Sequence, residues 1–196
     1  SGSSCTRAKQ HWMQVLHDNR KDMPIHVVQP GAADRSGSSC TRANSDGHNI
    51  TIAFLGRLDQ VKSPSVFLRV AYQIVSTLGR PRDRGTASSS SSGNDDDDTA
   101  RLQVSSSVRF LVIGTGPLEQ RLHDLAKRLG LRGRIVFTGA LNHADVLCLL
   151  STTVDLVLHT TLTNETFGLS NVEAMRAGVP VISYGVGGQA DYLREG

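Results

Sequence analysis

The sequence predicts an α/β fold in which a parallel, doubly wound sheet is covered by helices on both faces. From residue 49 onwards, short apolar runs that suit buried strands alternate with longer segments whose apolar residues recur at helical spacing. Strand and helix follow each other in the same order several times, and this alternation is typical of parallel sheets. Ligands of such sheets bind beyond the carboxyl ends of the strands, so we expect the functional residues at that edge.

The predicted units follow one another through the chain. Residues 50–55 alternate into a buried strand, and residues 65–78 carry apolar side chains at helical spacing. The remaining elements are expected, in order, as strand 108–113, helix 118–129, strand 135–138, helix 144–150, strand 154–158, helix 169–177 and strand 179–183. On the last helix we expect Leu169, Val172 and Met175 to share the buried face.

The first 48 residues differ from the rest of the chain. The octapeptide Ser-Gly-Ser-Ser-Cys-Thr-Arg-Ala occurs identically at residues 1–8 and 36–43, and two copies are too few for a repeat architecture. Between the copies we expect a helix over residues 10–19 and a short strand over residues 25–28. We interpret residues 1–48 mainly as linker sequence.

Residues 81–107 interrupt the regular pattern with a serine run at 88–92 and an aspartate run at 95–98. Because this segment can bury little apolar surface, it cannot offset the entropy of ordering, and we predict a disordered low-complexity insertion in a surface loop. Four adjacent aspartates could bind a hard cation, but nothing preorganises them. A solvated insertion is therefore the favoured interpretation.

Composition and charge exclude several kinds of partner. The formal net charge is +3, and no basic run alternates with aromatic residues as a nucleic-acid surface would need, so we predict no nucleic-acid partner. Nothing approaches the roughly 20 apolar residues of a membrane span, and the N-terminus has no apolar signal core, so a cytoplasmic location is expected. The spacing of Cys5, Cys40 and Cys148 does not suit a metal, and we expect no metal ion.

The most informative stretch places Glu165 and Glu173 on either side of the start of the last predicted helix. Gly168 lets the backbone turn there, and the amides near Gly168 and Leu169 could hold a diphosphate, because a helix start presents unpaired N–H groups and a positive dipole end. Carboxylates suit neutral hydroxyls rather than phosphates, and hydroxyls on both sides of a diphosphate describe a nucleotide sugar. The spacing alone is a weak signal, since Glu165 could cap the helix and Glu173 could be a solvated helix residue.

Two cations follow the first predicted strand. Gly56 and Arg57 close the strand, and Lys62 lies near the start of the next helix. Positive charge at this edge suits a diphosphate whose negative charge grows in the transition state. Taken alone, the same residues could be two surface cations on a loop.

A glycine turn at Gly114 and Gly116 opens another predicted helix. The third glycine of a dinucleotide fingerprint would fall on Glu119, so that interpretation fails. Two interpretations of this turn stay open. It could form part of the rim of the nucleotide-sugar site, or it could be a tight turn without a ligand. His159 ends the fourth strand of the regular region, and we assign it no catalytic role.

The order of these motifs resembles the retaining GT-B glycosyltransferases of family 4. The resemblance is carried by Asp-Leu-Val-Leu-His at 155–159, Glu-Thr-Phe-Gly at 165–168, Val-Glu-Ala-Met at 172–175, Ala-Gly-Val-Pro-Val-Ile at 177–182, the glycines at 187 and 188, and upstream by Gly56-Arg-Leu with Lys62, Gly114-Thr-Gly-Pro and Gly139. It covers most of residues 49–196. The chain departs from the family at two positions. Many members carry proline in place of His159, and glutamate is more common than aspartate at the position of Asp191.

The resemblance implies a division of the chain. Residues 49–196 would be the nucleotide-sugar-binding domain, the Rossmann-like C-terminal half of a GT-B glycosyltransferase, and residues 1–48 would hold the linker and the tail of a missing N-terminal acceptor domain. It also implies the site, in which the catalytic residues are Arg57, Lys62 and Glu165, and the donor-binding residues are Gly56, Gly114, Gly116, Thr166, Phe167, Gly168, Leu169 and Glu173.

Specific roles follow from the same resemblance. Arg57 and Lys62 would neutralise the diphosphate, Glu173 would accept the ribose hydroxyls, and Glu165 would hold the donor sugar near the reacting carbon. The expected reaction is a hexosyltransferase-type transfer from a nucleoside-diphosphate sugar to an unknown hydroxyl acceptor, with retention and without a cofactor or a metal. We expect the fragment alone to be inactive, and any peripheral membrane contact to come through the missing domain. The alternatives are a non-catalytic nucleotide-sugar-binding module and an epimerase or phosphorylase on the same fold.

Overall fold

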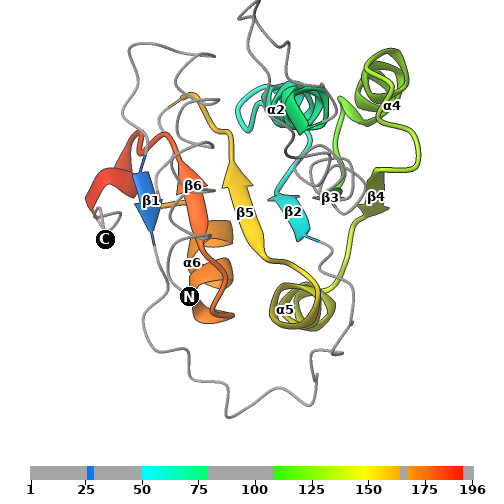
Figure 1. The fold of residues 1–196 in the computed structure, drawn as a ribbon. Helices are drawn as coiled ribbons and strands as arrows, with labels where there is room; N and C mark the ends of the chain where they lie inside the picture. Colours follow the sequence, from blue (N-terminus) through cyan, green and yellow to red (C-terminus); the bar gives the residue numbers. More distant parts are fainter. Residues whose placement is uncertain (1–25, 29–49, 79–107, 164–166, 192–196) are drawn as a thin grey trace, which may run out of the picture.

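The computed structural model describes residues 26–28, 50–78, 108–163 and 167–191 of the chain. Their centre is one six-stranded sheet in the order β1-β6-β5-β2-β3-β4 (Figure 1). The predicted helix at 10–19, the octapeptides and the predicted insertion at 81–107 lie outside the described residues.

The strands of this sheet are β1 His26–Val28, β2 Ile50–Leu55, β3 Val108–Ile113, β4 Ile135–Gly139, β5 Leu156–His159 and β6 Val181–Ser183. Strands β2 to β6 pair in parallel, which confirms the predicted doubly wound sheet for these five. β1 instead pairs antiparallel with β6 at the sheet edge. Part of the predicted N-terminal tail therefore lies in the same sheet as the domain that follows it.

The helices are α2 Pro64–Leu78, α4 Glu119–Arg128, α5 His143–Thr152 and α6 Leu169–Arg176, with a 3₁₀ turn η1 at Gly188–Asp191. Figure 1 shows α2 and α4 together on one face of the sheet, and α5 and α6 together on the other. The side chains of β2 alternate between these layers. Ile52 and Phe54 join the core beneath α2 and α4, while Ala53 and Leu55 join the core beneath α5 and α6.

The predicted buried face of α6 is wrong. Leu169 is 69% exposed, and Val172 and Met175 are only half-buried. The fully buried residues of the helix are Asn171 and Ala174, each 0% exposed. Hydrophobic periodicity pointed to the wrong face because a polar residue, Asn171, occupies a core position, where its side-chain amide donates a hydrogen bond to Gln189 at 3.0 Å.

Candidate functional site

The carboxyl edge of the sheet has a switch point between β2 and β5. From β2 the chain builds β3 and β4 on one side, then returns to place β5 and β6 on the other side of β2. Thr160, directly after β5, spans this point, because its hydroxyl donates to the carbonyls of Lys62 at 3.0 Å and Ser63 at 3.1 Å. The loop after β2 is thus tied to the loop after β5 at the place where open α/β sheets bind ligands.

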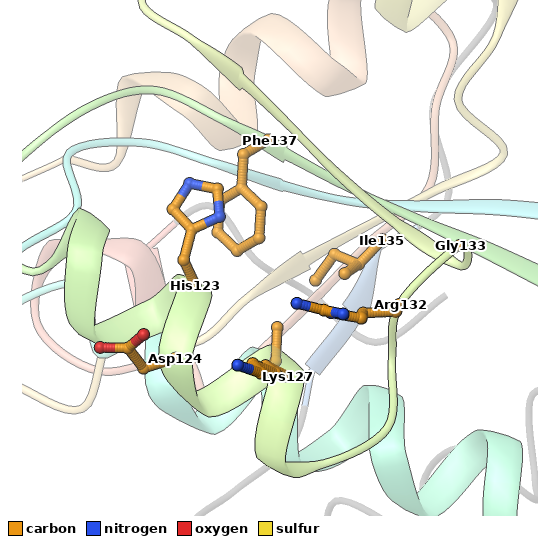
Figure 2. Close-up of a pocket in the computed structure, with 8 residues that line it drawn as sticks. His123, Asp124, Lys127, Arg132, Gly133, Ile135 and Phe137 are labelled. Atoms are coloured by element: carbon orange, nitrogen blue, oxygen red, sulfur yellow. The ribbon is translucent and has the colours of Figure 1, made fainter.

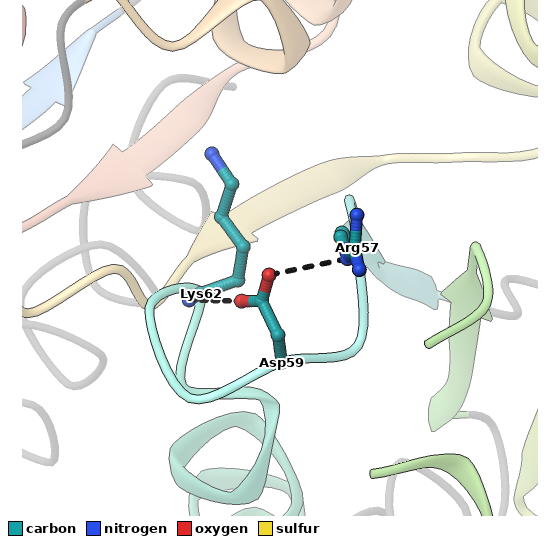
Figure 3. A network of polar contacts seen from close by, with 3 residues as sticks. All are labelled: Arg57, Asp59 and Lys62. Carbon is teal, nitrogen blue, oxygen red and sulfur yellow. Dashed lines mark hydrogen bonds and ion pairs between the residues drawn. The ribbon is translucent and has the colours of Figure 1, made fainter. Parts of the chain in front are cut away.

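Asp59 organises the loop that carries the two predicted cations (Figure 3). One carboxylate oxygen accepts the backbone N–H of Lys62 at 3.1 Å, and the other lies 3.5 Å from Nε of Arg57. The Arg57 side chain is 72% exposed, so this ion pair adds little to stability. Figure 3 shows the Lys62 side chain extending away from Asp59. Sequence reasoning missed Asp59, although aspartate side chains often accept hydrogen bonds from nearby backbone N–H groups in turns and before helices.

Gly114 allows the backbones of the β2–α2 loop and the β3–α4 loop to come into direct contact at this edge. A Cβ on Gly114 would lie 2.1 Å from the carbonyl oxygen of Gly56, and the backbone there has a φ of +131°. The amide of Gly56 donates to the carbonyl of Ile113 at 3.0 Å, and the amide of Gly114 donates to the carbonyl of Gly139 at 2.9 Å. A side chain at 114 would separate these loops.

Gly116 makes the second close approach of the same kind. Its added Cβ would lie 2.5 Å from the carbonyl oxygen of Leu58. Leu58 donates its N–H to the carbonyl of Thr115 at 2.9 Å and accepts the N–H of Leu118 at 3.0 Å. The two glycines therefore have a packing reason that involves no ligand, and their predicted donor-binding role stays a prediction.

The start of α6 lies on the same edge, because the helix follows β5. Gly168 precedes it with φ +69° and ψ +57°, a left-handed conformation that favours glycine. Its neighbours Phe167 and Leu169 are 51% and 69% exposed. The first N–H groups of a helix have no partner within the helix, so the helix start between these two exposed residues is suited to an anion. Glu165 and Thr166 lie outside the described residues.

Glu173, one turn further along α6, faces the neighbouring helix α5. Its Oε1 lies 3.3 Å from Nδ1 of His143, and the two side chains are 30% and 66% exposed. α5 begins beside this contact, where the side chain of Asn142 accepts the N–H of Asp145 at 2.9 Å. The structure thus adds His143 to the surroundings of Glu173, and no motif in the sequence had singled it out.

A pocket of about 440 Å³ lies elsewhere, between α4 and β4 (Figure 2). Its lining includes Lys127 and Arg132, together with His123 and Phe137, whose ring centroids lie 4.1 Å apart. β4 is an edge strand, and the lining contains none of the predicted site residues. Concavity alone therefore does not mark the predicted site.

The described residues contain neither a metal-binding cluster nor a membrane-spanning helix. No group of three or more His, Cys, Asp or Glu side chains among them is arranged to hold a metal ion. Within the same ranges, each helix is too short or too polar to span a bilayer.

Comparisons with known proteins agree on one family. The family model "Glycosyl transferases group 1" matches residues 98–196. A 2-deoxystreptamine N-acetyl-D-glucosaminyltransferase of Niallia circulans is 26% identical over 202 residues, which cover 95% of this chain and 44% of that protein. A D-inositol 3-phosphate glycosyltransferase of Rhodococcus opacus (strain B4) is 30% identical over 195 residues, which cover 93% of this chain and 37% of that protein.

The fold also resembles that of solved structures. Anabaena HepE, in complex with UDP and glucose, superposes with a TM-score of 0.53 at 24% sequence identity. The match covers 76% of this chain and 33% of that one. The chain therefore spans less than half the length of each of these three similar proteins.

Proposed function

The chain belongs to the glycosyl transferases group 1 family, and from this premise we propose that it forms the donor-binding part of an enzyme that transfers a sugar from a nucleoside-diphosphate sugar to a hydroxyl acceptor. The proposed reaction retains the configuration at the reacting carbon, as in the family 4 enzymes that the motifs resemble. An acceptor domain would precede residue 49, and residues 49–196 alone would bind the donor without transferring the sugar.

One observation carries this proposal most directly. The loop with Arg57 and Lys62 is fastened by Thr160 at the switch point between β2 and β5, and the exposed start of α6 follows β5 on the same edge. Positive side chains and helix amides at one edge together suit a diphosphate. The charge that grows on the leaving diphosphate would be stabilised by these groups without a metal ion.

In this proposal, the carboxylates of Glu165 and Glu173 bind the parts of the donor that carry hydroxyls. We assign the ribose hydroxyls to Glu173 on α6 and the sugar hydroxyls to Glu165, with Thr166 and Phe167 beside it. Ionised carboxylates accept hydrogen bonds from hydroxyls without repelling them, whereas they would repel a phosphate. Gly56, Gly114 and Gly116 shape the rim, and Gly168 and Leu169 offer their amides. The acceptor, and any peripheral membrane contact, would belong to the preceding domain of a cytoplasmic protein.

Calorimetric titration tests the proposal. The 196-residue chain is titrated with UDP, GDP and ADP, with their sugar derivatives, and with the matching nucleosides. UDP is the first probe because the similar solved structure contains it. We expect at least one diphosphate to bind, and its nucleoside to bind more weakly, since most of the proposed contacts reach the diphosphate. Absence of binding by every nucleotide in the panel would contradict the proposal.

A further inference from the structure

A buried amide joins three elements behind the start of α6. Gln189, in η1, is 0% exposed. Its Oε1 accepts hydrogen bonds from Nδ2 of Asn171 on α6 at 3.0 Å and from the hydroxyl of Ser183 at the end of β6 at 2.7 Å. Its Nε2 lies 3.2 Å from Nε2 of His159 at the end of β5. All four side chains are buried.

The two ends of the Gln189 side-chain amide meet different partners. Because Oε1 of Gln189 accepts two hydrogen bonds, its amide nitrogen faces His159, and an amide nitrogen only donates. In this arrangement Nε2 of His159 accepts the hydrogen bond of the Gln189 amide. The network therefore depends on the amide of Gln189 for three of its contacts.

Asn171 connects the buried cluster to the start of α6. It lies in the first turn of α6, where its backbone N–H donates to the carbonyl of Gly168 at 2.9 Å. Its other side-chain atom, Oδ1, is buried without a hydrogen-bond partner. Burying this oxygen without a partner costs stability. Its bond to Gln189 therefore points to orientation of the helix rather than to stability.

We propose that Gln189 is a positioning residue, which through Asn171 holds the first turn of α6 in the orientation that its amides and Glu173 need to meet a nucleotide. This inference rests on the proposed function, since it assumes that the start of α6 binds the diphosphate. Gln189 touches no substrate in this scheme. It acts by fixing α6 against the ends of β5 and β6, and small displacements of binding groups cost affinity steeply.

The test compares two variants that remove the hydrogen bond between Gln189 and Asn171 with a control variant that only lowers stability. Gln189→Met keeps the length of the side chain and removes its hydrogen bonds, and Asn171→Ala removes the link to α6 alone. Ile74→Ala is the control, because Ile74 is a buried residue of α2 in the other core layer. For each variant, the dissociation constant of UDP (or of GDP or ADP, where that is the tighter ligand of the parent chain) is measured together with the melting temperature.

We expect Gln189→Met and Asn171→Ala each to weaken UDP binding roughly tenfold. The double variant should weaken UDP binding no further, because both substitutions remove the hydrogen bond between Gln189 and Asn171. Ile74→Ala should lower the melting temperature and leave UDP affinity within about twofold of the parent. If the two losses multiply in the double variant, or if Ile74→Ala loses as much affinity, the positioning role is wrong. Where Gln189→Met does not fold, unchanged affinity of Asn171→Ala overturns it equally. A parent chain that binds no nucleotide overturns the proposed function itself, so the two failures are distinguishable.

Discussion

The two sides of the proposed diphosphate site are held by different kinds of contact. The β2–α2 loop is held by main-chain hydrogen bonds to the β3–α4 loop, at a distance that only glycine at 114 and 116 allows, and at its far end by the hydroxyl of Thr160. The start of α6 is held by a network of buried side chains around Gln189. A main-chain scaffold tolerates most side-chain changes but not a lost glycine, whereas a side-chain network can be weakened one group at a time. We therefore expect substitutions at the glycines to act on folding, and substitutions in the network to act on affinity.

The largest expected effect is that of Gly114→Ala on the β2–α2 side. The new Cβ would lie 2.1 Å from the carbonyl oxygen of Gly56, so one loop must move. We expect a loss of about 4 kcal/mol or more in the free energy of unfolding, or failure to fold. Urea titration followed by circular dichroism measures it.

Gly130→Ala is the matched control for this substitution. Gly130 also has a positive φ, +68°, but nothing lies within 4 Å of its added Cβ. Its cost should therefore be that of the backbone conformation alone, about 1 kcal/mol. Equal losses for the two variants would show that backbone strain, not the contact between loops, makes Gly114 necessary.

The next effect concerns Arg57, whose side chain extends from the main-chain scaffold. Arg57→Ala should weaken UDP binding by about tenfold or more, because charge-assisted contacts contribute roughly 1.5 to 3 kcal/mol, and uridine binding should hardly change. Stability should change by less than about 1 kcal/mol, because the pair with Asp59 is exposed. Calorimetry with both ligands measures the difference. Arg69→Ala, an exposed cation on α2, is the control, and equal losses for uridine and UDP would place Arg57 away from the diphosphate.

The two carboxylates give a smaller and more selective effect on the α6 side. Glu173→Gln preserves shape but replaces an acceptor-only group, so it should weaken UDP and its sugar nucleotide alike, by about fivefold to tenfold. Glu165→Gln should leave UDP unchanged and weaken the sugar nucleotide. Titration of both variants with both ligands, and melting temperatures alongside, decides between the roles.

Two controls keep this comparison interpretable. His143→Ala removes the partner of Glu173 on α5, and it should not reproduce the loss if the carboxylate meets the ribose directly. If Glu165 only caps the helix, Glu165→Gln will lower the melting temperature and change no ligand preference. The division of roles fails if neither glutamine variant distinguishes UDP from its sugar nucleotide.

The sequence predicted the elements better than their long-range contacts. The strands 50–55 and 108–113 have the bounds that the sequence predicts, because each apolar run ends at a glycine turn. The buried face of α6 could not be predicted, since a core asparagine is justified only by a partner 18 residues further on. The link between His159 and Gln189 spans 30 residues, and no local pattern encodes it. The roles of Arg57, Lys62 and the donor-binding residues came from the resemblance, and they stay predictions.

The smallest expected effect is that of replacing residues 81–107 with a short Gly/Ser linker. The segment lies outside the described residues, between the end of α2 at Leu78 and the start of β3 at Val108. The main-chain contacts of the β2–α2 side join residues before and after it, and the network around Gln189 lies wholly after it, so UDP affinity should stay within about twofold. Loop closure depends only logarithmically on length, and each halving of the loop should add about 0.6 kcal/mol of stability. Urea titration and calorimetry of the shortened chain measure both. A large loss of stability would show that the segment packs against the domain, and a loss of affinity alone would extend the site beyond the β2–α2 loop and the start of α6.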